Sequence, residues 1–287
     1  MAGFPLVNSS NRLWPMLAVL GSVTALGIGT SFAKQLFPLI GSLGTTALRV
    51  GFSALLVCIL WRPWRFPLHR VDAYRIVCYG VSLGCMNLLF YLSLRTIPFG
   101  LAVAIEFSGP MAVALHGSRR PLDGLWLALA AVALALLLPW SASPEALDPV
   151  GVLCALGAAF FWGAYIVFGK RVGHLPAQQS VALGLLVAAC TVAPLGLWQA
   201  GTALFHPGLL VFGVFIAAIS SAIPISLEML ALQRLSKATF GIMTSMEPAV
   251  AAVLALFLLH EQLSTLQWLA IGLSMGAAAG SALTHKA

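Results

Sequence analysis

Long apolar runs separated by short polar gaps fill almost the whole chain. Each run has the roughly 20 residues that an α-helix needs to cross a bilayer. This pattern predicts an all-α integral membrane protein with ten transmembrane helices, the first of which we interpret as a retained span and not as a signal peptide. The predicted spans lie at about 13–33, 43–61, 73–94, 99–116, 122–140, 149–169, 178–199, 208–232, 238–259 and 264–284.

The two halves of the chain resemble each other. Residues 17–34 match residues 153–170 without a gap. Landmarks recur in the same order: Lys34 as Lys170, Pro110 as Pro248, and Asp123 as Glu261. Such a repeat in a very apolar chain is typical of secondary transporters, in which two halves rock around a shared site. Because five spans is an odd number, we predict two inverted five-helix repeats, residues 1–140 and 141–287, within one membrane domain.

The basic residues indicate which side of the membrane each loop faces. With the amino terminus inside, twelve Lys and Arg side chains fall in inside loops, and only Lys34 and Arg95 fall in outside loops. Cytoplasmic loops of membrane proteins carry an excess of Lys and Arg. We therefore expect both termini in the cytoplasm.

Composition agrees with a chain surrounded by lipid. Of the 287 residues, 60% are hydrophobic and 8% are charged, whereas a water-soluble domain carries about 25% charged residues. The mean hydropathy is +0.99. The net charge of +7 comes from residues dispersed among the loops and not from one basic stripe. We therefore expect a lipid bilayer, and no nucleic acid, as the partner of this surface.

Motifs for enzymatic or ATP-driven chemistry are missing from the sequence. The five cysteines form no Cys-x-x-Cys pair, and the six histidines show no metal-ligand spacing. Gly169-Lys170 comes closest to a phosphate-binding loop, but Ala164 stands where its first glycine belongs. The sequence therefore predicts a protein that is not an enzyme and that holds no cofactor or metal.

Charged residues inside the predicted spans need a specific reason. At a helix centre, such a residue costs at least about 2.5–3.5 kcal/mol. Four ionisable side chains and one polar amide have this position, and they are candidates for the site: Arg49, Glu106, Glu228, Glu247 and Asn87.

Two of these acids lie beside prolines near the centre of their spans. Glu106 comes four residues before Pro110, and Glu247 comes directly before Pro248. A proline frees the backbone carbonyl four residues earlier, which belongs to Glu106 itself in the first case. We therefore expect both acids to bind a cation or an ammonium group, or to relay protons. Pro110, Pro248 and a third proline, Pro224, are the predicted hinges.

The remaining candidates have less distinct roles. Arg49 either meets a carboxylate or extends toward the outer interface, and we expect it to pair with Glu106 in the empty protein. Glu228 either lines a cytoplasmic vestibule or pairs with Arg234 or Lys237. Asn87 and Tyr91 lie one turn apart on one predicted helix and give it a polar face. Tyr165 and Ser245 complete the predicted substrate-binding residues.

Longer strings resemble the EamA-type drug/metabolite transporter superfamily and, within it, the bacterial threonine and homoserine exporters. They include Thr46-Ala47-Leu48-Arg49, Asn87-Leu88-Leu89-Phe90-Tyr91-Leu92-Ser93 and Ser245-Met246-Glu247-Pro248-Ala249. The resemblance covers nearly the whole chain. It implies a multi-pass exporter of small hydrophilic amino acids in the bacterial inner membrane, driven by the proton gradient.

These observations lead to a proton antiporter with alternating access as the expected function. A zwitterionic amino acid needs a cation for its carboxylate and an anion for its ammonium group, and Arg49 with Glu106 or Glu247 can supply both. In this hypothesis, Glu106 first and Glu247 second hold either a proton or the substrate ammonium. The alternative is an exporter of the same fold for another metabolite, an aromatic amino acid or a drug.

Overall fold

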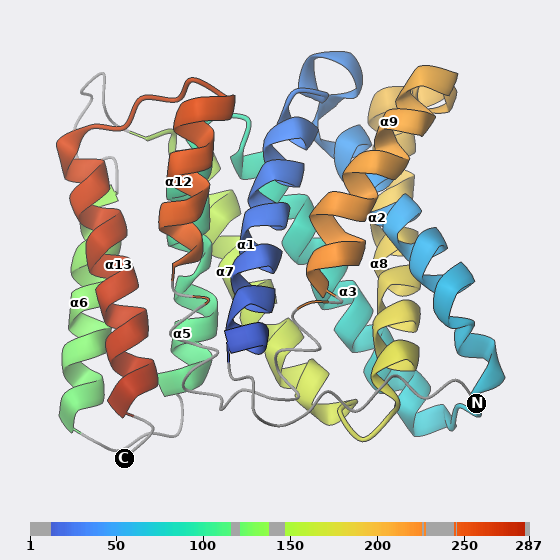
Figure 1. The fold of residues 1–287 in the computed structure, drawn as a ribbon, viewed down its shortest axis with the longest axis horizontal. Coiled ribbons are helices and arrows are strands. Elements are labelled where there is room, and N and C mark those ends of the chain that lie inside the picture. The colour runs from blue at the N-terminus through green and yellow to red at the C-terminus, as the bar shows by residue number, and fades with distance from the viewer. Residues whose placement is uncertain are drawn as a thin grey trace.

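The computed structural model describes residues 13–115, 121–137, 147–225, 227, 244 and 246–284. Within these ranges every regular element is helical, which confirms the predicted all-α class (Figure 1). The α-helices are α1 Leu13–Lys34, α2 Phe37–Trp61, α3 Arg70–Ser93, α4 Phe99–Glu106, α5 Ser108–Leu115, α6 Pro121–Leu137, α7 Pro149–Arg171, α8 Ala177–Ala200, α9 Pro207–Ala217, α12 Glu247–Leu258 and α13 Thr265–Thr284. The shorter elements are the 3₁₀ helices η1 Pro63–Arg65 and η2 Gly201–Phe205 and the π-helix η3 Ala218–Ala222.

Six helical stretches in the described part are long and apolar enough to cross a membrane. Large apolar side chains cover the outer faces of the helices: Leu60, Phe160 and, on the shorter α12, Phe257 are each 71% exposed. Exposed apolar side chains of this size are unfavourable in water and suit contact with lipid tails. The helices therefore form a membrane domain whose surface faces the hydrocarbon.

The helices stand side by side across this domain (Figure 1). α1 packs against α2 and, from the second half of the chain, against α9, α12 and η3. α2, α3, α7 and α8 form a tightly packed group. α6 and α13 pair with each other at the left of Figure 1, where they also contact α5. α1 begins and α13 ends at the lower edge of that view. The first span is thus an integral part of the fold.

The predicted span 99–116 is interrupted in the structure. α4 ends at Glu106 and α5 begins at Ser108, so a single helix over this range was wrong at Phe107. The cause is Pro110, which has no amide hydrogen to donate to the carbonyl of Glu106. The helical bonds on either side of the break run from Phe107 N to Val103 O (2.9 Å) and from Met111 N to Phe107 O (3.3 Å).

α2 begins at Phe37, six residues before the predicted start at 43, and bends at Gly41. Gly41 has φ 70° and ψ 174°, which is a backbone conformation that favours glycine. A Cβ there would also collide with the side-chain amide of Gln199. The Oε1 atom of Gln199 accepts a hydrogen bond of 2.8 Å from Leu43 N, so the end of α8 fixes the bend in α2.

The glycines of α13 differ in how closely α6 approaches them. A Cβ on Gly280 would collide with the ring of Trp126, whereas the nearest atom to a Cβ on Gly276 is Leu129 Cδ2 at 3.8 Å, and nothing lies within 4 Å of Gly272. Gly272, Gly276 and Gly280 are spaced four residues apart, a spacing that lets helices approach closely, but only Gly280 makes such a close contact with α6.

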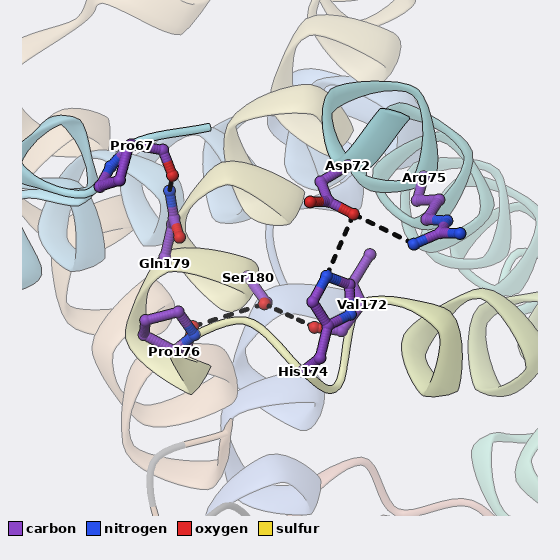
Figure 2. A network of polar contacts seen from close by, with 8 residues as sticks. All are labelled: Pro67, Asp72, Arg75, Val172, His174, Pro176, Gln179 and Ser180. Atoms are coloured by element: carbon purple, nitrogen blue, oxygen red, sulfur yellow. Dashed lines mark hydrogen bonds and ion pairs between the residues drawn. The ribbon is translucent and has the colours of Figure 1, made fainter. Parts of the chain in front are cut away.

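At the edge opposite Lys34, Asp72 joins α3 to the connection between α7 and α8 (Figure 2). Its Oδ1 lies 3.1 Å from Arg75 Nη1 and 3.1 Å from His174 Nε2. In the same view, Gln179 Nε2 donates to the carbonyl oxygen of Pro67 (3.4 Å). It also donates to the carbonyl oxygen of Phe66 (3.3 Å). The connection between α2 and α3 is thereby tied to the start of α8, which lies in the second half of the chain.

Candidate functional site

A cavity of about 150 Å³ lies between the two halves of the chain. α1, α2, α3 and α4 contribute to it from the first half, and α7, α8, η3 and α12 contribute from the second. Pockets for drug-sized ligands measure roughly 300–1,000 Å³, so this cavity suits a smaller molecule. Its walls are mostly apolar, and the polar or ionisable residues among them are Thr30, Arg49, Asn87, Tyr91, Glu106, Tyr165, Ser220, Ser221 and Glu247.

Arg49 is held in the cavity wall by uncharged groups. Its side chain comes from the middle of α2, and the residue is 5% exposed. Nη1 donates to the carbonyl oxygen of Ser220 at 3.3 Å and to Oγ of Ser221 at 3.2 Å, and Nη2 donates to Oδ1 of Asn87. The guanidinium carbon lies 4.8 Å from the centre of the Tyr91 ring, within the range of a cation–π interaction.

The expected ion pair between Arg49 and Glu106 is not formed in the structure. Among the described residues Arg49 has no carboxylate partner, and its Nε atom has no hydrogen-bond acceptor. The expectation was wrong because Ser220 and Ser221, in the π-helix η3, supply acceptors that were not among the predicted site residues. A buried cation thus retains an unused donor in the wall of a cavity.

Pro224 explains why the Ser220 carbonyl is available. In a regular α-helix this oxygen would accept a hydrogen bond from the amide of residue 224, which proline lacks. Ser220 lies within the π-helix η3, and its side chain is 1% exposed. Widened turns of this kind are frequent at functional sites. The predicted hinge at Pro224 thus contributes an acceptor to the cavity and lines it as well.

Asn87 orients the other side of the guanidinium. Its Nδ2 donates a hydrogen bond of 2.8 Å to the carbonyl oxygen of Leu83, one turn earlier on α3. This bond fixes the amide so that Oδ1, an acceptor, faces Arg49. The predicted polar face of this helix, made by Asn87 and Tyr91, is therefore part of the cavity.

The two acids predicted near mid-membrane line the same cavity. Glu106 is the last residue of α4 and is 7% exposed, and Glu247 is the first residue of α12. The charges of Glu247 and Arg49 both act on the Glu106 carboxyl group. The cavity thus contains one guanidinium group and two carboxyl groups, contributed by both halves.

Tyr165 lines the cavity from α7. Its ring stacks on Tyr79 with the centroids 4.8 Å apart, and a hydrogen bond of 3.1 Å joins the two hydroxyl groups. Pro110 and Pro248 are not among the cavity-lining residues, but they lie at the break between α4 and α5 and at the start of α12. Glu228 and Ser245, the two other predicted site residues, lie outside the described residues.

Three polar residues of the cavity were not predicted: Thr30, Ser220 and Ser221. A signal for the serines was present, because Ser220 stands four residues before Pro224. A proline frees the carbonyl four residues before it, and this rule also identified Glu106 from Pro110. Thr30 carries no such signal, since a single threonine in an apolar helix commonly bonds its own backbone.

Comparisons with known proteins agree with this arrangement. Residues 149–283 match the model of the EamA-like transporter family. The chain is 45% identical over 272 residues to proteins named "Threonine/homoserine exporter RhtA" from Escherichia coli (strain K12) and Salmonella typhimurium (strain LT2), and the alignment covers 95% of this chain and 92% of each relative.

More distant similarities are consistent with these. An "Uncharacterized transporter YwfM" of Bacillus subtilis (strain 168) is 27% identical over 247 residues, covering 81% of this chain and 80% of the relative. A solved structure titled "Crystal structure of protein" superposes with a TM-score of 0.63 at 17% identity, and the match covers 96% of this chain and 99% of that one. This last likeness shows a shared fold.

A pair of full-length relatives at 45% identity is sufficient to assign the family. The apolar helices and these relatives also place the protein in the bacterial inner membrane as a multi-pass transporter. The chain belongs to the EamA-like transporter family.

Proposed function

We propose that the protein exports small zwitterionic amino acids that carry a hydroxyl group, such as threonine and homoserine, in exchange for protons. The observation that carries the proposal is Arg49, a buried guanidinium that has only uncharged partners in the described part of the chain and faces a cavity it shares with two carboxyl groups. The relatives named as threonine/homoserine exporters support this choice of substrate.

The substrate carboxylate binds at Arg49. Guanidinium has five N–H donors, and the hydrogen bonds to Ser220, Ser221 and Asn87 leave Nε and one hydrogen of Nη2 for a ligand. A planar carboxylate can take both, and a hydrogen bond between two charged groups is about twice as strong as a neutral one. Ser220, Ser221 and Asn87 hold the guanidinium in place for this contact.

The substrate ammonium binds at the carboxyl groups, Glu106 first and Glu247 second. When the substrate leaves, the same carboxyl group takes a proton, so that the buried negative charge is never left uncompensated. Because one group cannot hold the proton and the ammonium together, inward movement of a proton alternates with outward movement of the amino acid. This is antiport by competition for one site.

The topology that completes the proposal consists of ten spans in two inverted repeats, residues 1–140 and 141–287, with both termini in the cytoplasm. The cavity supports it, because both repeats contribute to its walls. So does the common lower edge at which α1 begins and α13 ends (Figure 1). In this orientation the edge at which Lys34 lies is the outer one.

Transport in proteoliposomes tests the function. Radiolabelled threonine should exchange with unlabelled threonine, and a pH gradient should drive its net movement. Glu106→Gln should abolish the gradient-driven movement, whereas Asp148→Asn, an acid at the start of α7 that does not line the cavity, should leave it unchanged. Full transport by Glu106→Gln would remove this residue from the mechanism.

A further inference from the structure

Tyr91 has a buried hydroxyl group for which the described part of the chain supplies no partner. The residue is 0% exposed, and its hydroxyl oxygen has no hydrogen bond. Its ring is fixed by the guanidinium of Arg49 and by the rings of Phe37 and Phe90, each with its centroid 5.9 Å away. A buried tyrosine hydroxyl normally finds a partner, and leaving it unpaired costs about 1–3 kcal/mol.

A second hydroxyl group stands beside the first. Thr30 of α1 is 2% exposed, lines the same cavity, and lies next to the Tyr91 hydroxyl without the geometry of a hydrogen bond. The two side chains come from different helices, α1 and α3, so nothing in local helix geometry brings them together. They form a pair of polar groups in a wall that is otherwise mostly apolar.

We propose that Tyr91 and Thr30 bind the side-chain hydroxyl of the substrate and thereby select hydroxylated amino acids. This inference rests on the proposed function. Because the guanidinium of Arg49 lies over the Tyr91 ring, a carboxylate on Arg49 places the substrate's side chain toward the tyrosine hydroxyl. Two protein hydroxyl groups at different positions accommodate a β-hydroxyl, as in threonine, and a γ-hydroxyl, as in homoserine.

Selectivity follows from the unpaired hydroxyl group of Tyr91. A site built to hydrogen-bond a substrate hydroxyl strongly rejects an analogue without it, because the buried polar groups then remain unpaired. Valine has the shape of threonine with a methyl group in place of the hydroxyl. The subsite therefore discriminates against valine by much more than size alone would allow.

Competition in proteoliposomes tests this subsite. Unlabelled threonine and valine are compared as inhibitors of radiolabelled threonine exchange by the wild type, Tyr91→Phe and Thr30→Val. In the wild type, valine should inhibit at least about tenfold more weakly than threonine. In Tyr91→Phe this ratio should fall to about threefold or less, since the phenyl ring keeps its place under Arg49 but offers no hydroxyl.

Tyr79→Phe is the matched control, because Tyr79 lies on the same helix, bonds Tyr165 through its hydroxyl and does not line the cavity. It should leave the ratio unchanged. If the wild type exchanges no threonine, the proposed function fails. If it exchanges threonine and discriminates against valine, and Tyr91→Phe keeps the ratio, the subsite is wrong. If Tyr91→Phe does not insert into the membrane, Thr30→Val decides. A ratio of valine to threonine inhibition equal to that of the wild type then overturns the proposal, and a lower ratio supports it.

An ion pair between Lys34 and Glu261 joins the two halves of the chain and supports a second inference. Lys34, the last residue of α1, forms an ion pair with Oε1 of Glu261, which lies between α12 and α13. The other carboxylate oxygen, Oε2, accepts a hydrogen bond of 2.8 Å from the backbone amide of Phe99, the first residue of α4. One carboxylate thus joins three segments from both halves at the upper edge of the view (Figure 1).

This contact stands directly over the cavity. Phe99 is 2% exposed and its side chain lines the cavity, as does Thr30, one turn before Lys34 on α1. The opposite edge differs. Lys170, which the repeat places in the position equivalent to Lys34, is exposed and has no ion pair among the described residues.

The geometry points to Glu261 as the residue that locks the outer end of the cavity. The substrate can leave outward only after this carboxylate releases Lys34 and the start of α4. Loss of the carboxylate should open the outer end more often. Glu261 acts on the substrate through Phe99 and Lys34, so it is a positioning residue.

Accessibility of a cysteine in the cavity tests the lock. Leu26, which lines the cavity from α1, is replaced by cysteine in a chain whose five native cysteines are serine. A membrane-impermeant thiol reagent is then applied from outside intact cells. Glu261→Gln and Lys34→Gln should each raise the labelling rate several-fold, because both remove the ion pair.

Asp148→Asn, at an acidic position near the start of α7 that does not contact Lys34, is the control and should label at the parent rate. If Glu261→Gln and Lys34→Gln are both present in the membrane at normal levels and both label at the parent rate, the proposed lock is wrong. If Glu261→Gln does not insert, Lys34→Gln decides alone, since it leaves the hydrogen bond to the Phe99 amide in place.

Discussion

Nη1 of Arg49 donates a hydrogen bond of 3.3 Å to the carbonyl oxygen of Ser220. The two residues lie 171 positions apart, in opposite halves of the chain. The acceptor is available because Pro224, four residues after Ser220, has no amide hydrogen to offer it. A π-helical turn of the second half therefore holds the cation that the first half places in the cavity.

Replacing this proline should weaken substrate binding. Pro224→Ala restores the amide hydrogen, which can close the helical bond to Ser220 and withdraw that oxygen from Arg49. A hydrogen bond to a charged group is worth about 1.5–3 kcal/mol. The concentration of threonine that half-saturates exchange should therefore rise about tenfold or more, as measured in proteoliposomes.

Pro194→Ala is the matched control, since Pro194 lies inside α8, is exposed and does not line the cavity. It should change the half-saturating concentration by less than about twofold. An unaltered value in Pro224→Ala would show that the contact between Arg49 and Ser220 does not contribute to binding.

Gly29 of α1 should tolerate no side chain, because any Cβ at this position would displace Ser220. A Cβ added at Gly29 would lie 2.7 Å from both Cα and N of Ser220, so the backbone of Ser220 would have to move away from α1. Such overpacking typically costs about 1–3 kcal/mol. We expect Gly29→Ala to reduce transport strongly and to lower the thermal unfolding temperature.

Gly51→Ala serves as the comparison, because nothing lies within 4 Å of a Cβ at that position of α2. Alanine there should be neutral or slightly stabilising, since glycine inside a helix costs about 0.5–1 kcal/mol relative to alanine. Equal behaviour of the two variants would contradict the close contact between α1 and η3.

The helices of the described residues could be read from the sequence because their cause is local. Run length predicted the helices to within a few residues at most ends, as for α7, expected at 149–169 and found at Pro149–Arg171. The loosened turn beside Glu106 was also predictable, since proline acts within its own helix. The start of α2 was not, because the bend at Gly41 depends on Gln199 from α8.

The cavity was only partly predictable. Charge inside an apolar run identified Arg49, Glu106 and Glu247, because burying charge in lipid always needs a reason. The partner of Arg49 was wrong because two candidate acceptors, a carboxylate and a freed carbonyl, cannot be ranked without distances. Thr30 could not be found at all, since its significance comes from the neighbouring hydroxyl of Tyr91 on another helix.

Asn87 offers a test of why the partners of Arg49 are uncharged. Asn87→Asp places a carboxylate where Oδ1 now accepts from Nη2 of Arg49. The resulting ion pair competes with the carboxylate of the substrate for the same cation. We expect the half-saturating concentration of threonine to rise at least about tenfold, which corresponds to about 1.4 kcal/mol, while the protein inserts and unfolds like the wild type.

Asn87→Ser removes the carboxamide without adding charge and gives the comparison for that variant. It should have a smaller effect than Asn87→Asp, because it weakens the support of Arg49 but introduces no competitor. An aspartate variant that binds threonine as well as the wild type would contradict the assignment of the carboxylate site to Arg49.

Asp148 should make the start of α7 sensitive to acid. The Thr96 hydroxyl and the Gly151 amide, which donates a 2.9 Å hydrogen bond to Oδ2, hold the pKa of the Asp148 carboxyl group below its usual value. A carboxyl group whose pKa is lower in the folded state stabilises it fully above the pKa of the unfolded state. That contribution is lost as the pH falls through the pKa of the folded state.

Asp148→Asn keeps a side-chain oxygen to cap the helix but removes the charge. The difference in unfolding temperature between the wild type and this variant, measured in detergent, should therefore be largest near neutral pH and shrink as the pH is lowered below the usual range of an aspartate. Because the group is partly exposed, the difference should also decrease with added salt. A difference that stays constant from neutral to acidic pH would show that the Asp148 charge does not stabilise the start of α7.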